Sequence, residues 1–291
     1  MNKFSIRDIE MLSGIKAHTF RIWEQRHGLY FCKRKDSQHR FYDNEDLKAV
    51  LRIAYLYHRG YKISKIANLS RDEVVELASA NIQTHNYDLS IRQLIEASID
   101  YDQLRFEKII QHAILRFGFD KSILRVFYPF MEKIGLLWVT EHLIPAQEHF
   151  SSCLIQQKII VAIDMLVPPQ LNREDTILIF APEGEMHEIP LLIAQYHFKK
   201  NGIKTIYFGA NTAIPELEYY NNHRKITHLY FHSITNFSNR EPDEYIKCLL
   251  LKFPGVKIIV SGSALEKIQV DSSLVKIAST VEDLIPVFLS L

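Results

Sequence analysis

The residues after 175 alternate between short apolar runs and amphipathic stretches, and this alternation restricts the fold more than any other feature of the sequence. It predicts strands at 176–180, 204–208, 227–232, 256–261 and 275–278, and helices at 189–200, 214–223, 241–253 and 281–289. Strands that alternate with helices form a parallel sheet with helices packed on its faces. We therefore predict a doubly wound, Rossmann-like domain over residues 172–291.

Residues 88–168 carry only a helical pattern. Apolar side chains recur every three or four residues, for example at Ile123, Val126 and Phe130, and the loops between the helical stretches are short. Such spacing is typical of amphipathic helices, and short loops favour antiparallel neighbours. We predict a four-helix bundle here, preceded by a polar connector with some helical tendency at 71–90.

Residues 1–75 predict a winged helix-turn-helix domain. An apolar spacing from Ile6 to Leu12 fits one face of a first helix, Gly14 interrupts the pattern, and a second helix follows. A helix, a glycine-containing turn and a second helix form the motif that places its second helix in the major groove of DNA. The basic stretch 28–40 predicts a hairpin wing beside these helices.

The charge of the chain is divided between a basic head and a mildly acidic body. Residues 1–70 carry fourteen Lys and Arg against seven Asp and Glu, whereas the rest carries 21 against 27. A basic domain attracts phosphates because each neutralised phosphate releases counterions. We therefore expect the head to bind double-stranded DNA and the body to control that binding.

The composition predicts a cytoplasmic protein that does not enter a membrane. The N-terminus lacks an apolar signal region, and no uncharged apolar run reaches the length of a membrane span. Cys32, Cys153 and Cys248 have the spacing of neither a disulfide framework nor a zinc site.

Three residues of the predicted bundle have side chains suited to covering a ligand. Trp138 lies near the end of one helix, and Glu148 and His149 follow Pro145 in the first turns of the next. An indole with a carboxylate–imidazole pair can cover an adenosine-like group. From the residue types alone, a core tryptophan and a surface Glu-His pair are the simpler interpretation.

The loop after the first strand of the last domain carries a candidate metal ligand. His187 is placed near the carboxyl edge of the predicted sheet, with Glu185 two positions earlier. A neutral imidazole binds transition metals well when a carboxylate holds its other nitrogen. From the residues alone, a loop histidine satisfied by its neighbour is the simpler interpretation.

The head resembles the winged helix-turn-helix of the MerR family of regulators. The resemblance rests on the segments 4–6, 13–15, 19–24 and 40–42, although Gln38 stands where the family usually has glycine. It implies that the second helix enters the major groove and that the wing contacts phosphates. The implied DNA contacts are Lys16, His18, Arg21, Arg34, Arg40 and Tyr42. Trp23 is expected to be a packing residue.

The last domain resembles cobalamin-binding domains. Glu185-x-His187 is similar to their Asp/Glu-x-His-x-x-Gly loop, in which histidine replaces the cofactor's own base beneath cobalt. Two further motifs, at 233–235 and 261–262, are similar to the residues that line the channel for the nucleotide tail. The implied cofactor contacts are Trp138, Glu148, His149, Glu185, His187 (as the cobalt ligand), Ser233, Thr235, Ser261 and Gly262.

Over its full length the order of motifs resembles the MerR-type cobalamin-dependent photoreceptor repressors. In that family the bundle covers adenosylcobalamin, light cleaves the cobalt–carbon bond, and the dark form is a tetramer on promoter DNA. The resemblance implies the same cofactor, an operator partner and self-association as a dimer or tetramer.

Three positions depart from the family pattern. Pro190 replaces the glycine of the histidine loop, and Ser261 replaces the first glycine of the Gly-Gly pair. Val139 stands where the best-understood photoreceptors have the histidine that takes the vacated cobalt face after illumination. These differences leave two alternatives open: a regulator that has lost cobalamin and responds to a protein partner, and a corrinoid methyl carrier. The basic head and the absence of a second catalytic domain argue against the enzyme.

Overall fold

The computed structural model describes most of the chain and divides it into two compact units, Met1–Leu154 and Ile155–Leu291. The described residues are 3–29, 33–34, 40–80, 87–139, 145–167, 169, 174–234, 241–262, 270, 272–278, 283–284 and 286–287; the side chains of 33–34, 40, 79–80 and 136–139 are excluded. Among these residues, none of the helices is both long and apolar enough to cross a membrane. Each unit is described by itself.

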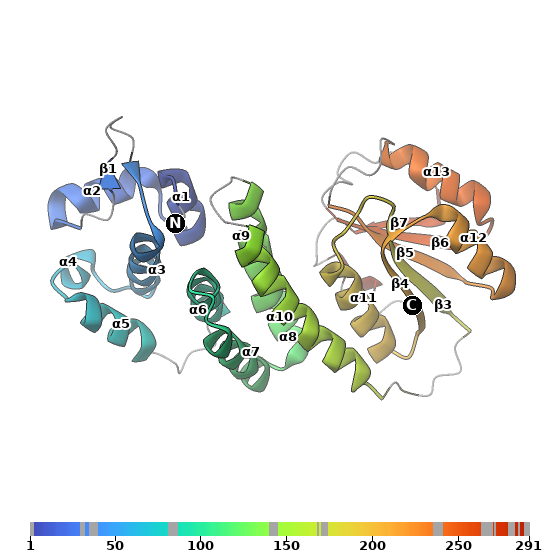
Figure 1. The fold of residues 1–291 in the computed structure, drawn as a ribbon, viewed down its shortest axis with the longest axis horizontal. Coiled ribbons are helices and arrows are strands. Elements are labelled where there is room, and N and C mark those ends of the chain that lie inside the picture. Colours follow the sequence, from blue (N-terminus) through green and yellow to red (C-terminus); the bar gives the residue numbers. More distant parts are fainter. Residues whose placement is uncertain are drawn as a thin grey trace. The chain divides into compact units, whose positions relative to one another are not determined.

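The head contains the predicted helix-turn-helix and its wing (Figure 1). Its elements are α1 (Ile6–Ser13), α2 (Ala17–His27), β1 (Lys33–Arg34), β2 (Arg40–Phe41), α3 (Asn44–His58), α4 (Ile63–Ile66) and α5 (Arg71–Ala80). The short strands pair antiparallel, with Lys33 opposite Phe41. Trp23 is buried and packs edge-on against Phe20 and Tyr57, which confirms the packing role expected for it.

The helical tendency predicted for the connector at 71–90 is realised as helix α5, which is more regular than a connector. Ser70 and Glu73 form a reciprocal cap, in which the Ser70 N–H donates to Glu73 Oε2 at 2.7 Å and the Glu73 N–H donates to Ser70 Oγ at 3.2 Å. Val74 and Ala78 are buried, so this helix is anchored on one face. A capped start with two apolar contacts is sufficient to order a helix that is otherwise polar.

The bundle completes the first unit. Its helices are α6 (Tyr87–Ile99), α7 (Gln103–Phe117), α8 (Phe119–Ser122), a π-helical segment (Ile123–Phe127), α9 (Tyr128–Val139) and α10 (Pro145–Asp164), the last of which continues into the second unit. Its core includes Phe106, Ile110, Phe130 and Ile134, all fully buried. Pro145 opens α10, where a proline costs no hydrogen bond.

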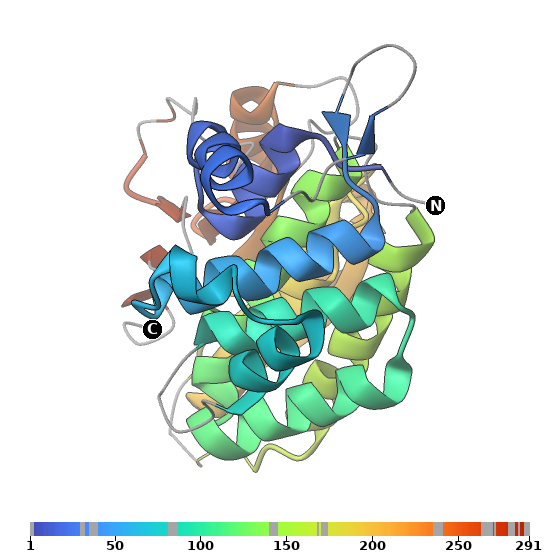
Figure 2. The same ribbon diagram turned by 90° about the vertical axis from the view of Figure 1, so that its left-hand side faces the viewer.

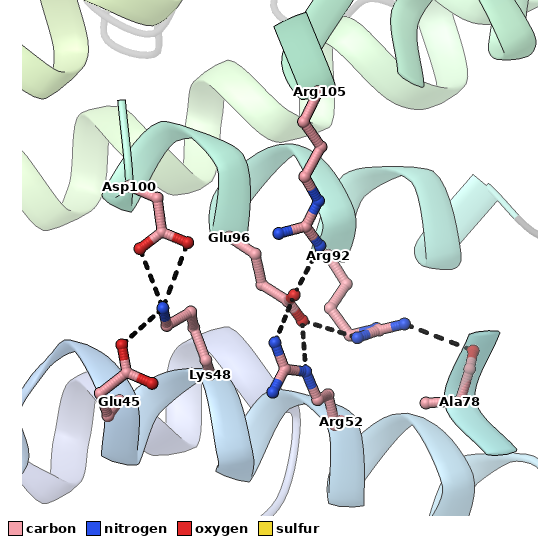
Figure 3. Close-up of polar contacts among 8 residues, drawn as sticks. All are labelled: Glu45, Lys48, Arg52, Ala78, Arg92, Glu96, Asp100 and Arg105. Atoms are coloured by element: carbon pink, nitrogen blue, oxygen red, sulfur yellow. Dashed lines mark hydrogen bonds and ion pairs between the residues drawn. The ribbon is translucent and has the colours of Figure 1, made fainter. Parts of the chain in front are cut away.

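Helix α3 of the head lies beside α6 of the bundle (Figure 2), and ion pairs join the two parts (Figure 3). The buried carboxylate of Glu96 on α6 accepts hydrogen bonds from Arg52 of α3, Arg92 of α6 and Arg105 of α7, at 2.6–3.2 Å. Beside them, Lys48 of α3 donates to Asp100 at 2.9 Å. One acid therefore holds three guanidinium groups from three helices at the joint between the two parts of this unit.

The second unit is the predicted doubly wound sheet. Its elements are β3 (Thr176–Pro182), α11 (Ile189–Lys200), β4 (Lys204–Thr212), α12 (Ile214–His223), β5 (His228–His232), α13 (Pro242–Lys252), β6 (Lys257–Ser261) and β7 (Val275–Ala278). All strands are parallel and lie in the order β4-β3-β5-β6-β7. Of the last helix predicted, 281–289, only 283–284 and 286–287 lie within the described residues, and these are helical.

Both faces of the sheet are buried. Alternate residues of β3 point to opposite sides, so Ile177 and Ile179 pack with α11, whereas Leu178 and Phe180 pack with α12 and α13 (Figure 1). Strands buried on both faces give continuous apolar sequences, which explains the runs seen in the sequence.

Candidate functional site

The turn between α1 and α2 is fixed by backbone and side-chain bonds. Gly14 has a φ of 70°, which favours glycine, and its N–H donates to Glu10 O at 2.9 Å. Oε2 of Glu10 accepts the Ala17 N–H at 3.2 Å, so a carboxylate caps the start of α2 and complements its dipole. His58 of α3 contacts the Ser13 carbonyl at 3.0 Å. These contacts hold α2 in a defined orientation on the head.

The outward face of α2 carries the predicted DNA-contacting side chains. Lys16, His18 and Arg21 are exposed, whereas Phe20 and Trp23 on the opposite face are buried. This division is what a recognition helix requires, because one face must pack on the head while the other reaches base edges and phosphates.

Gln25 and Arg26 are two exposed residues of the same helix that the sequence analysis did not assign to DNA. Gln25 lies one turn after Arg21, on the same face, and the i, i+4 spacing was the signal for it. Both side chains can reach bases or phosphates through hydrogen bonds.

Of the three predicted wing residues, the structure describes the side chain of Tyr42 but not those of Arg34 and Arg40. Arg34 and Arg40 lie on the paired strands β1 and β2, but their side chains are outside the described residues. Tyr42 is only 1% exposed, and its backbone pairs with Phe4. In this structure Tyr42 is a core residue, so its side chain is not accessible for the expected contact between its hydroxyl and a phosphate. Its place beside a buried phenylalanine explains the burial.

The predicted Glu-His pair lies in the first turns of α10. Nδ1 of His149 contacts Oε2 of Glu148 at 3.0 Å, and the His149 side chain is 74% exposed. Trp138 lies near the end of α9, but its side chain and that of Val139 are outside the described ones. The polar pair therefore lies at the surface of the bundle, with His149 the more exposed of the two. That the pair lies close to the indole of Trp138 stays a prediction.

The polar residues predicted for the sheet lie at its carboxyl edge. The strand order reverses direction at β3, because β4 lies on one side of it and β5 on the other. The crevice outside such a switch point is where doubly wound sheets bind ligands. The loops after β3 and β5, which contain His187 and Ser233, are the two that border it.

Glu185 and His187 form the pair that the sequence predicted. Oε1 of the fully buried Glu185 accepts the His187 N–H at 3.1 Å and contacts Nδ1 of the imidazole. Oε2 accepts the N–H of Ile234, at the end of β5, at 2.9 Å. The His187 ring is 46% exposed. A buried carboxylate thus fixes the orientation of an accessible imidazole, and Nε2 is the nitrogen that could bind a metal.

The loop that carries this pair is tied to the neighbouring strand. Residues 182–185 form a turn in which the Glu185 N–H donates to Pro182 O at 2.9 Å and Gly184 adopts a φ of 89°. Asn211 of β4 donates its N–H to Glu185 O at 3.0 Å, and its side chain accepts the Gly184 N–H at 2.9 Å. These bonds place Glu185 before any ligand arrives. Pro190 lies in the first turn of α11, where the fold tolerates it.

The residues predicted for the nucleotide tail meet through pairing of β5 and β6. Ser233 is buried and its N–H donates to Ser261 O at 2.8 Å. Gly262 has a φ of 119°, and a Cβ there would lie 1.9 Å from the Ser233 carbonyl oxygen. Glycine is therefore required at 262 by the approach of β5 itself. Thr235 lies outside the described residues.

A buried polar cluster that the sequence analysis missed surrounds Ser261. Its Oγ lies 2.7 Å from the Tyr230 hydroxyl and 2.7 Å from Nδ1 of His232. Burial lowers the pKa of His232 to about 4, so the imidazole is neutral at physiological pH. The side chain of Ser261 is thus held by two neighbours on the sheet. No pattern in the sequence signals this cluster, because it forms only through the strand pairing that places His232 opposite Ser261.

Comparisons with known proteins give family matches for two segments of the chain. Residues 4–73 match the family described as MerR HTH family regulatory protein, and residues 90–162 match the family described as B12 binding domain. Two similar proteins are HTH-type transcriptional repressors of Myxococcus xanthus. CarA is 26% identical over 216 residues, covering 73% of this chain and 70% of that protein. CarH is 24% identical over 214 residues, covering 71% and 70%.

A solved structure is similar in fold. The monomethylamine corrinoid protein of Methanosarcina barkeri superposes with a TM-score of 0.54 and 14% identity, covering 67% of this chain and 95% of that one. At this identity the likeness concerns the fold, which is the helical domain and parallel sheet predicted from the sequence.

Proposed function

The chain is a MerR-family regulator with a B12-binding domain, and we propose that cobalamin controls its binding to operator DNA. The observation that carries this proposal is the accessible imidazole of His187, oriented by the buried carboxylate of Glu185 at the switch point of the sheet. The proposed role is regulatory, with no catalytic residue, and the protein is expected to act in the cytoplasm.

The head supplies the contact with DNA. The exposed face of α2, with Lys16, His18 and Arg21, is proposed to enter the major groove, and the basic wing to contact the neighbouring backbone. A single head offers a small contact area, so two heads held in register would gain affinity through their effective concentration. Self-association as a dimer or tetramer is therefore part of the proposal.

The residues of the second unit fit a cobalamin. The cofactor brings its own equatorial ligands for cobalt, so the protein needs to add one donor, and Nε2 of His187 is suited to that task. Glu185 holds Nδ1 and thereby fixes the tautomer and the orientation of the ring, with Nε2 as the nitrogen that would bind cobalt. Ser233, Thr235, Ser261 and Gly262 are proposed to border the nucleotide tail. The held hydroxyl of Ser261 shows why serine is accommodated where the family has glycine.

Adenosylcobalamin is the proposed form of the cofactor. It supplies a cobalt–carbon bond that light breaks, and Trp138, Glu148 and His149 of the bundle are proposed to cover its adenosyl group. The surface position of Glu148 and His149 is consistent with a role that begins only when a ligand arrives.

The proposal is tested by mixing the purified full chain with adenosylcobalamin in the dark, removing free cofactor and recording the visible spectrum. Retained corrin absorbance, followed by a fall in mass on illumination measured by light scattering, is the expected result. A colourless protein would instead favour a regulator of the same build that responds to a protein partner. Retained corrin without any effect on DNA binding would favour a corrinoid carrier.

A further inference from the structure

A cavity lies in the first unit between the head and the bundle. It has a volume of about 420 Å³ and is lined by residues of α1, α3, α6 and α9. None of these residues belongs to the DNA-contacting face or to the proposed cobalamin site. Its volume falls within the range of pockets that bind small molecules.

Two buried polar atoms on residues that line the cavity have no hydrogen-bond partner. They are Nε of Arg92 and the hydroxyl of Tyr55. The guanidinium lies 5.0 Å from the centre of the Tyr55 ring, so the two groups are neighbours. Arg92 Nε can only donate and a tyrosine hydroxyl donates readily, so a ligand that accepts hydrogen bonds would satisfy both once these covered atoms turn toward the cavity. Buried donors without partners are rare because each costs free energy.

The charge around the cavity is positive. Arg59, Arg92 and Lys133 line it, against the single acid Asp88. The charge of Arg92 is only partly neutralised by Glu96, because the same carboxylate also pairs with Arg52 and Arg105 (Figure 3). The hydrogen bond from Arg92 to the Ala78 carbonyl is long, at 3.5 Å. The pKa of Arg92 is lowered by burial, which agrees with an incompletely compensated cation.

The rest of the lining is apolar. Leu12, Leu51, Ile91 and Ile95 contribute aliphatic side chains. A ligand that fits both the basic and the apolar lining has an apolar body and an anionic end that bears acceptor oxygens. Carboxylates and phosphate esters share this chemistry.

We propose that the cavity between the head and the bundle binds a small organic anion, with its acceptor oxygens against Arg92, Tyr55 and Lys133. Because the walls come from both parts of the unit, the bound anion stabilises this docking of the head on the bundle. The ligand is thus a second effector, independent of cobalamin.

The test uses the full chain without cobalamin and two probes, hexanoate and hexyl phosphate, with neutral hexanamide as the control ligand. Isothermal titration is expected to show saturable binding of at least one anion and a matching rise in the melting temperature, with hexanamide inactive. The stronger probe identifies the class of the natural ligand. No saturable binding of either anion at millimolar concentration, or equal binding of hexanamide, would overturn the proposal.

Tyr55→Phe is the decisive variant. Removing a hydroxyl that bonds an anionic ligand is expected to weaken binding of the preferred anion by about tenfold. The same change deletes a buried hydroxyl without a partner, so the ligand-free protein should melt no lower than the wild type. This combination separates lost binding from lost folding. Replacing Arg92 is less suitable because it would leave Glu96 without its shortest ion pair.

Tyr101→Phe is the matched control, since this exposed tyrosine is not among the residues that line the cavity. It is expected to bind the probes as the wild type does. Lys133→Gln is expected to weaken binding as Tyr55→Phe does. Unchanged affinity in both Tyr55→Phe and Lys133→Gln would overturn the assignment of the site. None of these results bears on the proposed cobalamin site, because none of the tested residues belongs to it.

Discussion

Glu185 holds Nδ1 of His187 through one carboxylate oxygen, inside a loop that the two residues share. The other oxygen of the same carboxylate is bound to the chain at the end of β5, at 2.9 Å. The glutamate therefore links the two loops that border the switch point of the sheet. A ligand bound to the imidazole would contact a side chain that is already oriented, which lowers the entropy cost of binding.

The first prediction concerns His187. His187→Ala removes the proposed cobalt ligand and is expected to weaken cobalamin binding by at least about tenfold, while Glu185→Gln, which loosens the imidazole, should cost about tenfold. The measurement is corrin absorbance retained after gel filtration over a range of cofactor concentrations. His223→Ala, an exposed histidine of α12, is the control. Wild-type affinity in His187→Ala would remove the assignment of this residue.

The second prediction concerns Arg21 of the outward face of α2. Arg21→Ala is expected to weaken operator binding and to lower the slope of log K against log salt concentration by about one, because one phosphate contact is lost. Fluorescence anisotropy with a labelled operator at several salt concentrations measures both. Arg71→Ala, an exposed arginine of α5, should leave the slope unchanged. If the Arg21 variant keeps the wild-type slope, α2 does not contact phosphate through this side chain.

The third prediction concerns Glu96, the shared acid of the ion pairs in Figure 3. Glu96→Gln leaves three guanidinium groups without their charge partner and is expected to cost about 3 kcal/mol of stability at neutral pH. Urea denaturation followed by circular dichroism measures the loss. Glu107→Gln, which alters an exposed pair with Gln103, is the control and should cost little.

Acid should weaken the same joint. Burial alone would raise the pKa of Glu96, but the guanidinium groups of Arg92 and Arg52 lower it below its ordinary value of 4.5. A carboxylate with a lowered folded-state pKa stabilises the fold fully above its unfolded-state pKa, and this contribution is lost as the pH falls through the folded-state value. The stability difference between the wild type and Glu96→Gln should therefore shrink below about pH 4. A constant difference across that range would contradict the ion-pair account.

The fourth prediction concerns His232. Its folded-state pKa of about 4 lies below the ordinary value of 6.5 because the imidazole is buried. The unfolded chain takes up a proton below pH 6.5 while the folded chain does not, so stability falls from there down to about pH 4, by about 3 kcal/mol. His232→Asn keeps a hydrogen-bonding group near Ser261 but removes this titration. Its unfolding free energy should decline less than that of the wild type over the interval, and an equal decline would show that His232 is protonated in the fold.

Much of the fold was predictable because its determinants are local. Apolar runs alternate with amphipathic stretches in this part of the sequence, so the strand Val275–Ala278 and the helix Ile214–His223 were placed at their observed bounds. The extension of β4 to Thr212 was missed, since it depends on a register shift opposite Phe180 rather than on apolar pattern. Helix α5 was predicted only as a helical tendency within a connector, although the cap formed by Ser70 and Glu73 was present in the sequence.

In the candidate sites too, contacts between residues close in sequence were predictable, and contacts between distant segments were not. Glu185 and His187 are two residues apart, so their contact follows from the loop itself. The cluster of Tyr230, His232 and Ser261 joins two strands, and only the pairing of β5 with β6 brings it together. The burial of Tyr42 depends likewise on a bridge to Phe4, a residue far away in the chain. Contacts between distant segments are set by tertiary structure, which apolar spacing does not reveal.

The most direct test of the account is the affinity of the full chain for its operator in three states: without cofactor, with adenosylcobalamin in the dark, and after illumination of that complex. The operator is first selected from random duplexes, and affinity is measured by anisotropy at one fixed salt concentration. The account predicts at least about tenfold tighter binding in the dark complex, a coupling of about 1.4 kcal/mol or more, and its loss on illumination. The same affinity in all three states would contradict control of DNA binding by cobalamin.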